Sequence, residues 1–151
     1  MSLLYFEDIQ PGQAVVSPVF KVDREEMVAF ARVWDPLPFH VDEAAGRETH
    51  GSLIAPGLFV LGVKLRLIHQ SPHLAVLASM GYDEVRFHEP VRPGDELTLR
   101  REWLSGRLSQ SRPDRGIIKA RYLLNNQEGR TVMSHLDTLL VRRRPSPTTN
   151  A

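Results

Sequence analysis

The sequence predicts an α+β fold in which one long apolar helix is wrapped by a curved, mostly antiparallel sheet. Residues 56–70 are apolar in nearly every direction around a helix axis, which is typical of a helix that is buried on most sides. The segments that follow favour strands, because their apolar residues tend to alternate with polar ones and short turns join them. Consecutive strands with short connections indicate an antiparallel sheet.

The elements before the long helix are one strand and one helix. Residues 13–22 are rich in β-branched side chains and predict a strand, with Pro18 at an edge or a bulge. Asp23 is the expected N-cap of a helix that ends near Trp34, and Glu26 has the spacing to bond back to the cap. The helix shows one apolar face, made of Met27, Phe30, Ala31 and Trp34.

The rest of the chain is predicted as follows. Pro36 ends the first helix, and a short helix is expected over 42–48. Pro56 and Gly57 suit the start of the long helix. Strands are expected over 75–88, 95–108, 116–126 and 130–143, with turns at 92–95 and 126–129. Arg101 interrupts the apolar face of its strand, so we expect that face to be incompletely buried.

A strongly curved sheet around a central helix is the hotdog fold, an α+β architecture. We expect a single hotdog domain over residues 1–144 and a disordered tail over 145–151, where prolines and small polar residues follow three arginines. A sheet wrapped on one helix leaves a helix face or a sheet edge uncovered. A homodimer, or a higher homo-oligomer, would cover it.

Composition excludes several classes of protein. The chain has 151 residues with 19 basic and 18 acidic side chains, and its net charge of +1 gives little attraction to nucleic acid. It has no cysteine, which removes disulfides, zinc–thiolate sites and a cysteine nucleophile. No signal peptide or membrane-spanning run is visible, so we expect a cytoplasmic protein without a membrane partner.

One short segment combines the residue types of general acid–base catalysis. Asp35 and His40 are separated by a stretch that Pro36 and Pro38 stiffen, outside any expected helix or strand. An acid and an imidazole aimed by a rigid turn suit proton transfer. The alternative is that Asp35 belongs to an ordinary turn and that His40 is an ordinary packed or surface side chain, and spacing alone favours that alternative.

The start of the long helix offers a second functional group. Pro56 and Gly57 open it, and the N–H groups of a first helical turn lack partners within the helix. Such donors, at the positive end of the helix dipole, can hold a carbonyl oxygen on which negative charge develops. Together with the acid and the imidazole, they suit chemistry next to a carbonyl.

Other polar clusters favour structural roles. The remaining histidines (His50, His69, His73, His88 and His135) have no partner pattern. A metal site of His40, Asp42 and His50 is conceivable, but its spacing matches no known signature. The arginines at 142–144 favour a solvated strand end. Those at 107, 112 and 115 flank a long hairpin loop, and contact with a phosphate-bearing carrier is the functional alternative for both groups.

Three motifs resemble the MaoC-like dehydratases, which include the (R)-specific enoyl-CoA hydratases. They are Asp-Pro-Leu-Pro-Phe-His-Val-Asp at 35–42, His-Gly-Ser-Leu-Ile-Ala-Pro-Gly-Leu at 50–58, and Phe-His-Glu-Pro-Val-Arg-Pro-Gly-Asp at 87–95. The resemblance covers residues 5–144. Many hydratases carry Asn two positions after the Asp, where this chain has Leu37, and a subgroup with Asp-Pro-x-Pro-Phe-His also lacks it.

The resemblance implies a hydro-lyase that hydrates a trans-2-enoyl thioester or dehydrates an (R)-3-hydroxyacyl thioester. Asp35 and His40 would activate one water between them, and the Gly57 N–H, next to Pro56, would hold the thioester oxygen. The implied partner is an acyl-CoA or acyl-carrier thioester, and the reaction needs no cofactor and no metal.

Two other functions fit the same fold. A hotdog thioesterase would need a carboxylate along the central helix, and residues 58–68 contain neither Asp nor Glu. A non-catalytic acyl-thioester-binding subunit would keep the fold without turnover, and Leu37 is the residue that keeps this alternative open.

Overall fold

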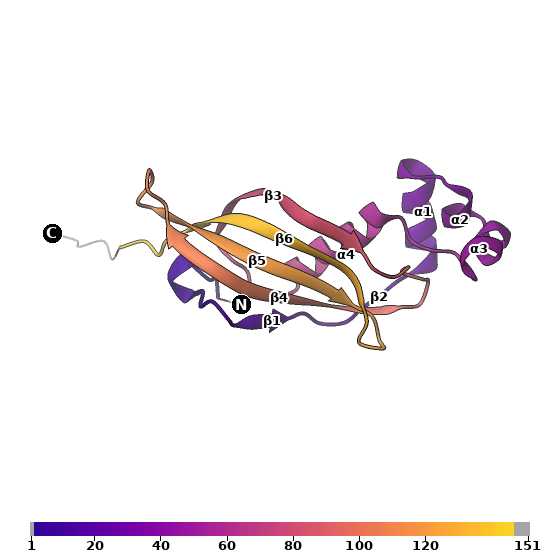
Figure 1. Ribbon diagram of the computed structural model, residues 1–151, viewed down its shortest axis with the longest axis horizontal. Helices are drawn as coiled ribbons and strands as arrows, with labels where there is room; N and C mark the ends of the chain where they lie inside the picture. The colour runs from indigo at the N-terminus through magenta and orange to yellow at the C-terminus, as the bar shows by residue number, and fades with distance from the viewer. Residues whose placement is uncertain (1, 147–151) are drawn as a thin grey trace.

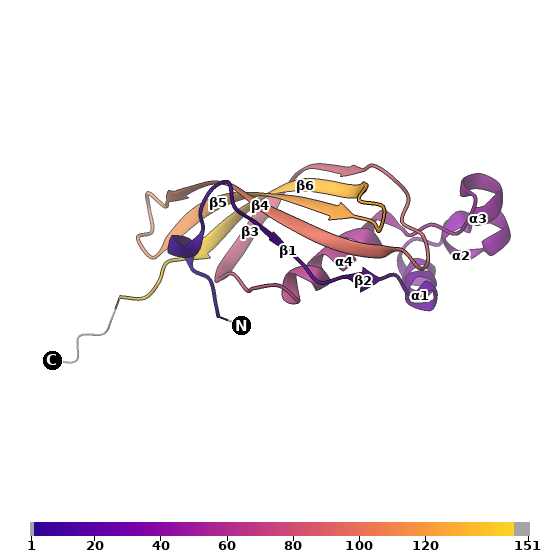
Figure 2. The same ribbon diagram turned by 90° about the horizontal axis from the view of Figure 1, so that it is seen from below.

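In the computed structural model, which describes residues 2–146, an antiparallel sheet curves over one side of a long helix (Figures 1 and 2). The sheet has the order β1-β4-β5-β6-β3, with β2 also pairing with β4. Its strands are β1 (Ala14–Val16), β2 (Phe20–Lys21), β3 (Val76–Phe87), β4 (Glu96–Leu108), β5 (Arg115–Asn125) and β6 (Thr131–Arg142). The helices are η1 (Phe6–Asp8), α1 (Arg24–Trp34), α2 (Pro38–Val41), α3 (Glu43–His50) and α4 (Gly57–His69). The α+β hotdog expectation is confirmed.

The expected strand over 13–22 is divided in two. Ser17 and Pro18 separate β1 from β2, and both strands pair with β4. Proline has no N–H for the ladder, so pairing breaks there. The Ser17 hydroxyl accepts a hydrogen bond from Leu99 N at 2.9 Å and satisfies one backbone donor of β4.

Helix α1 begins and ends where the sequence predicts. Asp23 caps it by accepting from Glu26 N at 2.8 Å, but the Glu26 carboxylate bonds Arg66 of α4 rather than the cap. Met27 and Ala31 are fully buried on the predicted apolar face. Trp34, expected on that face, is the last residue of α1 and is 69% exposed, with its ring centre 6.5 Å from that of Phe30.

Helix α4 is buried on one side only within a single chain. Phe59, Val60, Val63, Lys64 and Leu67 are buried against the sheet, whereas Leu58 and Leu65 are exposed. Figure 2 shows the sheet above the helix, with β2 and α1 beside the N-terminal part of α4. The prediction that α4 is covered on most sides is therefore wrong for one protomer.

The face of β4 is incompletely buried, as expected, because residues 104–108 are all exposed, but Arg101 is not the cause. Leu97, Leu99, Arg101 and Trp103 all point inward and are buried. Arg101 is accommodated because its guanidinium donates to Pro72 O at 3.1 Å and lies over the Trp103 ring at 4.7 Å. A cation can enter a core when it has such partners.

Within residues 2–146, no helix has both the length and the apolar character needed to cross a membrane. The expected tail over 145–151 remains a prediction, and residues 147–151 of it lie outside the described part of the chain.

Candidate active site at the start of the central helix

The structure brings Asp35 and His40 together. Asp35 is the C-cap of α1, and His40 lies in the single turn α2, not outside regular structure as the sequence suggested. Pro36 prevents α1 from continuing, and Pro38 occupies the first position of α2, where its missing N–H has no cost. The Asp35 Oδ2 atom lies 3.5 Å from His40 Nε2.

Hydrogen bonding fixes the orientation of the His40 ring. Its Nδ1 atom lies 2.7 Å from Ile54 O, and a carbonyl oxygen can only accept, so Nδ1 carries the proton. Ile54 N in turn donates to Phe39 O at 3.2 Å, which links α2 to the segment that leads into α4. In neutral His40, Nε2 is then left with a free lone pair beside the Asp35 carboxylate.

The two groups differ in their access to solvent. The His40 side chain is 6% exposed, whereas that of Asp35 is 41% exposed. Both Nε2 of neutral His40 and the Asp35 carboxylate are acceptors, and 3.5 Å is longer than a good direct hydrogen bond. A water molecule that donates one hydrogen to each satisfies both acceptors and keeps its oxygen lone pairs free.

A cavity of about 370 Å³ connects this dyad with the start of α4. His40 and Gly57 both line it, and Asp35 lies beside it against His40. Pro56 is the buried N-cap of α4 and accepts from Val60 N, so it shapes the helix start and is not itself a lining residue. The complete lining is His40, His50, Ile54, Ala55, Gly57, Val60, Phe87, His88, Glu89, Pro90 and Val91.

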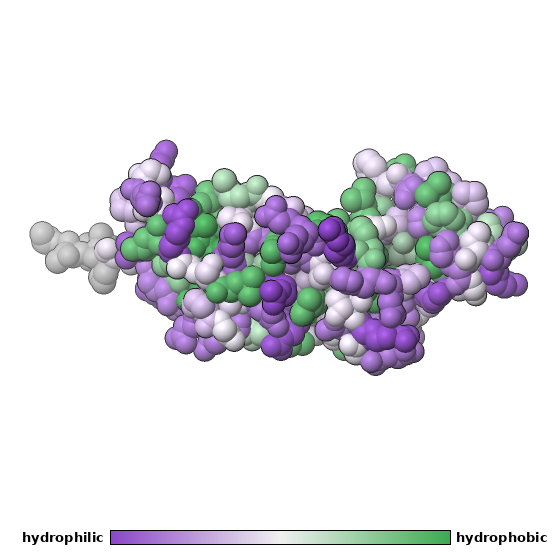
Figure 3. All heavy atoms as spheres, in the orientation of Figure 1, coloured by the Kyte–Doolittle hydropathy of each residue, from purple (hydrophilic) through white to green (hydrophobic). Residues whose placement is uncertain are grey.

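Gly57 allows a close contact between the helix start and an aromatic ring. A Cβ atom built on Gly57 would lie 2.7 Å from Cζ of Phe87 at the end of β3. The absence of a side chain lets the Phe87 ring lie over the first turn of α4, where the unpaired N–H groups are. Figure 3 shows a waist, with hydrophobic residues along it, where the sheet meets the end that carries α1–α3.

The turn at 92–95 supports this end of the molecule. Asp95 Oδ2 accepts from Arg92 N at 2.8 Å, and the Arg92 guanidinium donates to His50 O at 2.7 Å and to Ser52 Oγ. Ala55 N donates to Val91 O at 2.8 Å. The third motif of the sequence thus holds the second motif in place, directly before α4.

Several candidates from the sequence are not brought to this site. Asp42 caps α3 through Ala44 N and Ala45 N, and within residues 2–146 no group of three His, Asp or Glu side chains is spaced to hold a metal ion. Arg143 and Arg144 pair with Glu7 and Asp8. Figure 1 places the β4–β5 hairpin, with its arginines, at the opposite end of the sheet from α2 and α3. His50 and His88, considered structural from sequence, line the cavity.

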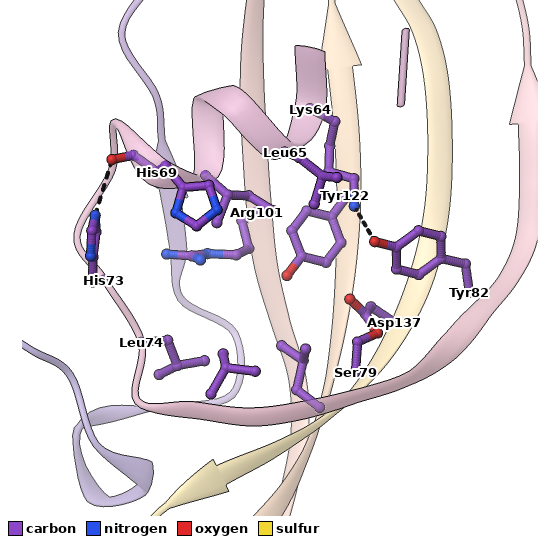
Figure 4. Close-up of a pocket in the computed structure, with 13 residues that line it drawn as sticks. Lys64, Leu65, His69, His73, Leu74, Ser79, Tyr82, Arg101, Tyr122 and Asp137 are labelled. Atoms are coloured by element: carbon purple, nitrogen blue, oxygen red, sulfur yellow. Dashed lines mark hydrogen bonds between the residues drawn. The ribbon is translucent and has the colours of Figure 1, made fainter. Parts of the chain in front are cut away.

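Sequence reasoning missed a second cavity, farther along α4. It measures about 340 Å³ and lies between α4, β3 and the inner face of the sheet (Figure 4). Lys64 and Arg101 line it, and both are buried. The only signals in the sequence were one lysine within an apolar helix and one arginine on an apolar strand face.

Lys64 is a buried cation with few partners. Its Nζ donates to Tyr82 Oη at 2.9 Å and lies 4.1 Å from the centre of the Tyr82 ring. Burial lowers the pKa of Lys64 from its ordinary 10.5 to about 8, and Asp137 opposes this change. A pKa difference of this size corresponds to a penalty of about 3 kcal/mol for the charged form.

We expect Lys64→Met to increase stability at pH 7, by about 1–2 kcal/mol once the lost Tyr82 contacts are subtracted. The penalty is fully present below about pH 8, where Lys64 is charged in both the folded and unfolded states, and it disappears as the pH approaches 10.5. Urea denaturation should show that the variant exceeds the wild type in free energy of unfolding by less at pH 10 than at pH 7. A less stable variant at pH 7 would show that the ammonium is stabilising where it lies.

The curved sheet on a central helix defines the hotdog class of proteins. Within this class the chain belongs to the MaoC-like domain family, which it matches over residues 8–117.

Three relatives illustrate the match. The chain is 33% identical over 98 residues to protein MaoC of Klebsiella aerogenes, and it spans only 29% of the length of that protein. A MaoC-like dehydratase of Rhodospirillum rubrum has a TM-score of 0.87 at 34% identity, with 95% of this chain and 99% of that chain covered. The 3R-hydroxyacyl-ACP dehydratase HadBC of Mycobacterium tuberculosis has a TM-score of 0.68 at 26% identity, with 86% of this chain and 96% of that chain covered.

Proposed function

We propose that the protein is a hydro-lyase that reversibly hydrates a trans-2-enoyl thioester to an (R)-3-hydroxyacyl thioester. The observation that carries this proposal is the Asp35–His40 pair, 3.5 Å apart, beside a cavity that is lined by Gly57, the first residue of α4. The family match and the two dehydratases among the similar structures support the same reaction class.

In the hydration direction, His40 and Asp35 hold the water. His40 Nε2 accepts a proton as the water oxygen attacks the β-carbon, because the bond from Nδ1 to Ile54 O leaves Nε2 as the basic atom. Asp35 orients the water and stabilises the imidazolium. The α-carbon receives its proton through the dyad, so one water supplies both the hydroxyl and the new C–H hydrogen.

The start of α4 stabilises the charge that forms on the substrate. Attack at the β-carbon moves electron density onto the thioester oxygen, which gains enolate character. The Gly57 N–H, at the positive end of the α4 dipole, donates to that oxygen. Because the thioester itself acidifies the α-position, the proposal requires no cofactor and no metal.

The direct test is the loss of enone absorbance when the purified protein meets trans-2-enoyl-CoA thioesters of several chain lengths. Repeating the assay with thioesters on an acyl-carrier protein determines which carrier is used. Release of free thiol without hydration would identify a thioesterase instead. Binding of acyl thioesters without any turnover would identify an accessory subunit.

The lack of cysteine fits a reducing compartment, so we place the reaction in the cytoplasm.

We also propose that two chains pair through β3. This strand is an edge of the sheet, and Val76, Met80 and Phe87 on it are exposed, as is Leu58 on the uncovered side of α4. Exposed apolar edge strands favour pairing with another strand.

The pairing predicts that the wild-type protein has the mass of two chains in light scattering. Met80→Glu places like charges close together at a self-complementary contact, so we expect it to shift the protein toward the mass of one chain. Val33→Glu, on the exposed surface of α1, is the matched control and should leave the dimer intact. A Met80→Glu variant that stays dimeric would place the contact elsewhere.

A further inference from the structure

The cavity around Lys64 lies in line with the candidate active site. Gly57 and Val60 of α4 line the first cavity and Lys64 and Ile68 line the second. On the facing strand β3, Phe87 lines the first and Tyr82 the second. The same helix and strand therefore border both cavities. At the rise of an α-helix, Lys64 is about 10 Å along the axis from Gly57, and its side chain leans back toward the helix N-terminus.

The second cavity carries an excess of buried positive charge. Lys64 and Arg101 are 0% and 3% exposed, and Asp137, also buried, is the one carboxylate in the lining, so two cations and one anion leave a single positive charge. The Asp137 carboxylate already accepts from Ser79 Oγ at 2.6 Å. Figure 4 shows the Arg101 guanidinium, the Tyr122 hydroxyl and Asp137 around the same space, with Leu74 on its lower side.

The buried cations have unused hydrogen-bonding capacity. In the described structure Lys64 Nζ donates one hydrogen bond, to Tyr82 Oη, and the Arg101 guanidinium donates to Pro72 O and also interacts with the Tyr122 hydroxyl. An ammonium has three donors and a guanidinium five, and buried cations are stable when an anion accepts from them. The remaining lining is largely apolar, which suits an aliphatic chain that ends in an anionic group.

We propose that this cavity receives the far end of the acyl chain and that Lys64 and Arg101 bind a carboxylate there, so that the preferred substrates are dicarboxylic acyl thioesters. This inference rests on the proposed function, because it assigns the substrate class of the same site. The thioester lies at Gly57, the chain follows α4 and β3, and the terminal carboxylate neutralises the surplus positive charge.

The test compares enoyl-CoA thioesters of equal chain length that end in a carboxylate, in its methyl ester, or in a methyl group, over several lengths. For the best length we expect kcat/KM to be at least tenfold higher for the carboxylate than for the two neutral ends. Lys64→Met should lower this ratio at least tenfold. Lys64→Arg keeps the positive charge and should give a ratio between those of Lys64→Met and the wild type. Lys119→Met, the same charge change at an exposed position of β5, is the control and should keep the wild-type ratio.

The pH dependence gives an independent readout. The charged and titratable groups around Lys64 are Arg101 on β4, Tyr82 on β3, Tyr122 on β5, and His135 and Asp137 on β6. His69, at the end of α4, and His73, before β3, line the same cavity. Burial raises the pKa of both tyrosines and lowers that of His135, which leaves Lys64 as the member of this cluster that titrates near pH 8. The carboxylate-to-methyl ratio of kcat/KM should therefore fall as the pH rises through about 8.

The outcomes separate the two proposals. If methyl-ended substrates are hydrated as well as carboxylate-ended ones at every length, and Lys64→Met leaves the ratio unchanged, the inference is wrong and the hydratase function stands. If no substrate is hydrated, the proposed function fails. In that case the inference is tested by comparing the binding of saturated adipyl-CoA and hexanoyl-CoA to the wild-type protein. Tighter binding of adipyl-CoA would support it, and equal affinities would overturn it.

Discussion

Asp35→Asn is expected to lower kcat/KM for the hydration of a 2-enoyl thioester by about 10²–10⁴-fold, the range of a positioned acid or base. The amide keeps the size of the side chain but removes the charge that orients the water and stabilises protonated His40. Because the Asp35 side chain is 41% exposed and the substitution leaves the backbone hydrogen bond from Asp35 N to Ala31 O in place, the variant should fold normally. The measurement is the initial rate of loss of enone absorbance.

His40→Ala tests the other member of the pair and should give a loss of similar size. The two losses should not add in the double variant, because both act on one water. His40 also bonds Ile54 O, so its variant needs a thermal unfolding curve beside the rate. Asp114→Asn, in the hairpin at the opposite end of the sheet, is the control and should retain the wild-type rate. Unchanged rates in Asp35→Asn and His40→Ala would show that these roles are wrong.

Gly57→Pro is expected to lower kcat by about 10²–10³-fold, because it removes the N–H that is proposed to hold the thioester oxygen. The helix itself tolerates the change, since proline is favoured at the first helical position. Pro56 has a ψ of 146°, which is the extended conformation that a residue before proline adopts.

Gly57→Ala is the matched control for this variant. It adds the same Cβ atom against the Phe87 ring but keeps the N–H, and Phe87 is half exposed and can move aside. The account predicts a much smaller loss for alanine than for proline. Equal losses in the two variants would assign the effect to crowding by the side chain, and full activity in Gly57→Pro would remove Gly57 from the mechanism.

Much of the fold could be predicted from the sequence because its signals are local. The four long strands follow from their alternating side chains, and α1 follows from Asp23 before it and Pro36 after it. The same holds for the dyad, since two prolines restrict the backbone between Asp35 and His40. The break in the first strand at Ser17 was harder to predict, because it depends on how that segment meets β4.

Features that depend on packing between distant segments could not be predicted. Lys64 and Arg101 are 37 positions apart in the sequence, and only the curvature of the sheet over α4 places them around one cavity. The burial of α4 on one side reflects the same limit, because the residues of a single helix do not reveal whether its second face is covered by its own chain. His50 and His88 lacked any partner pattern for the same reason.

The most direct test of the central claim is a crystal structure of the Asp35→Asn variant with a bound 3-hydroxyacyl-CoA. The account predicts the thioester oxygen at about 2.7–3.1 Å from Gly57 N, the distance range of an oxyanion donor. It also predicts the 3-hydroxyl group within hydrogen-bond reach of His40 Nε2. A thioester bound away from the start of α4, or a hydroxyl group that does not face His40, would contradict it.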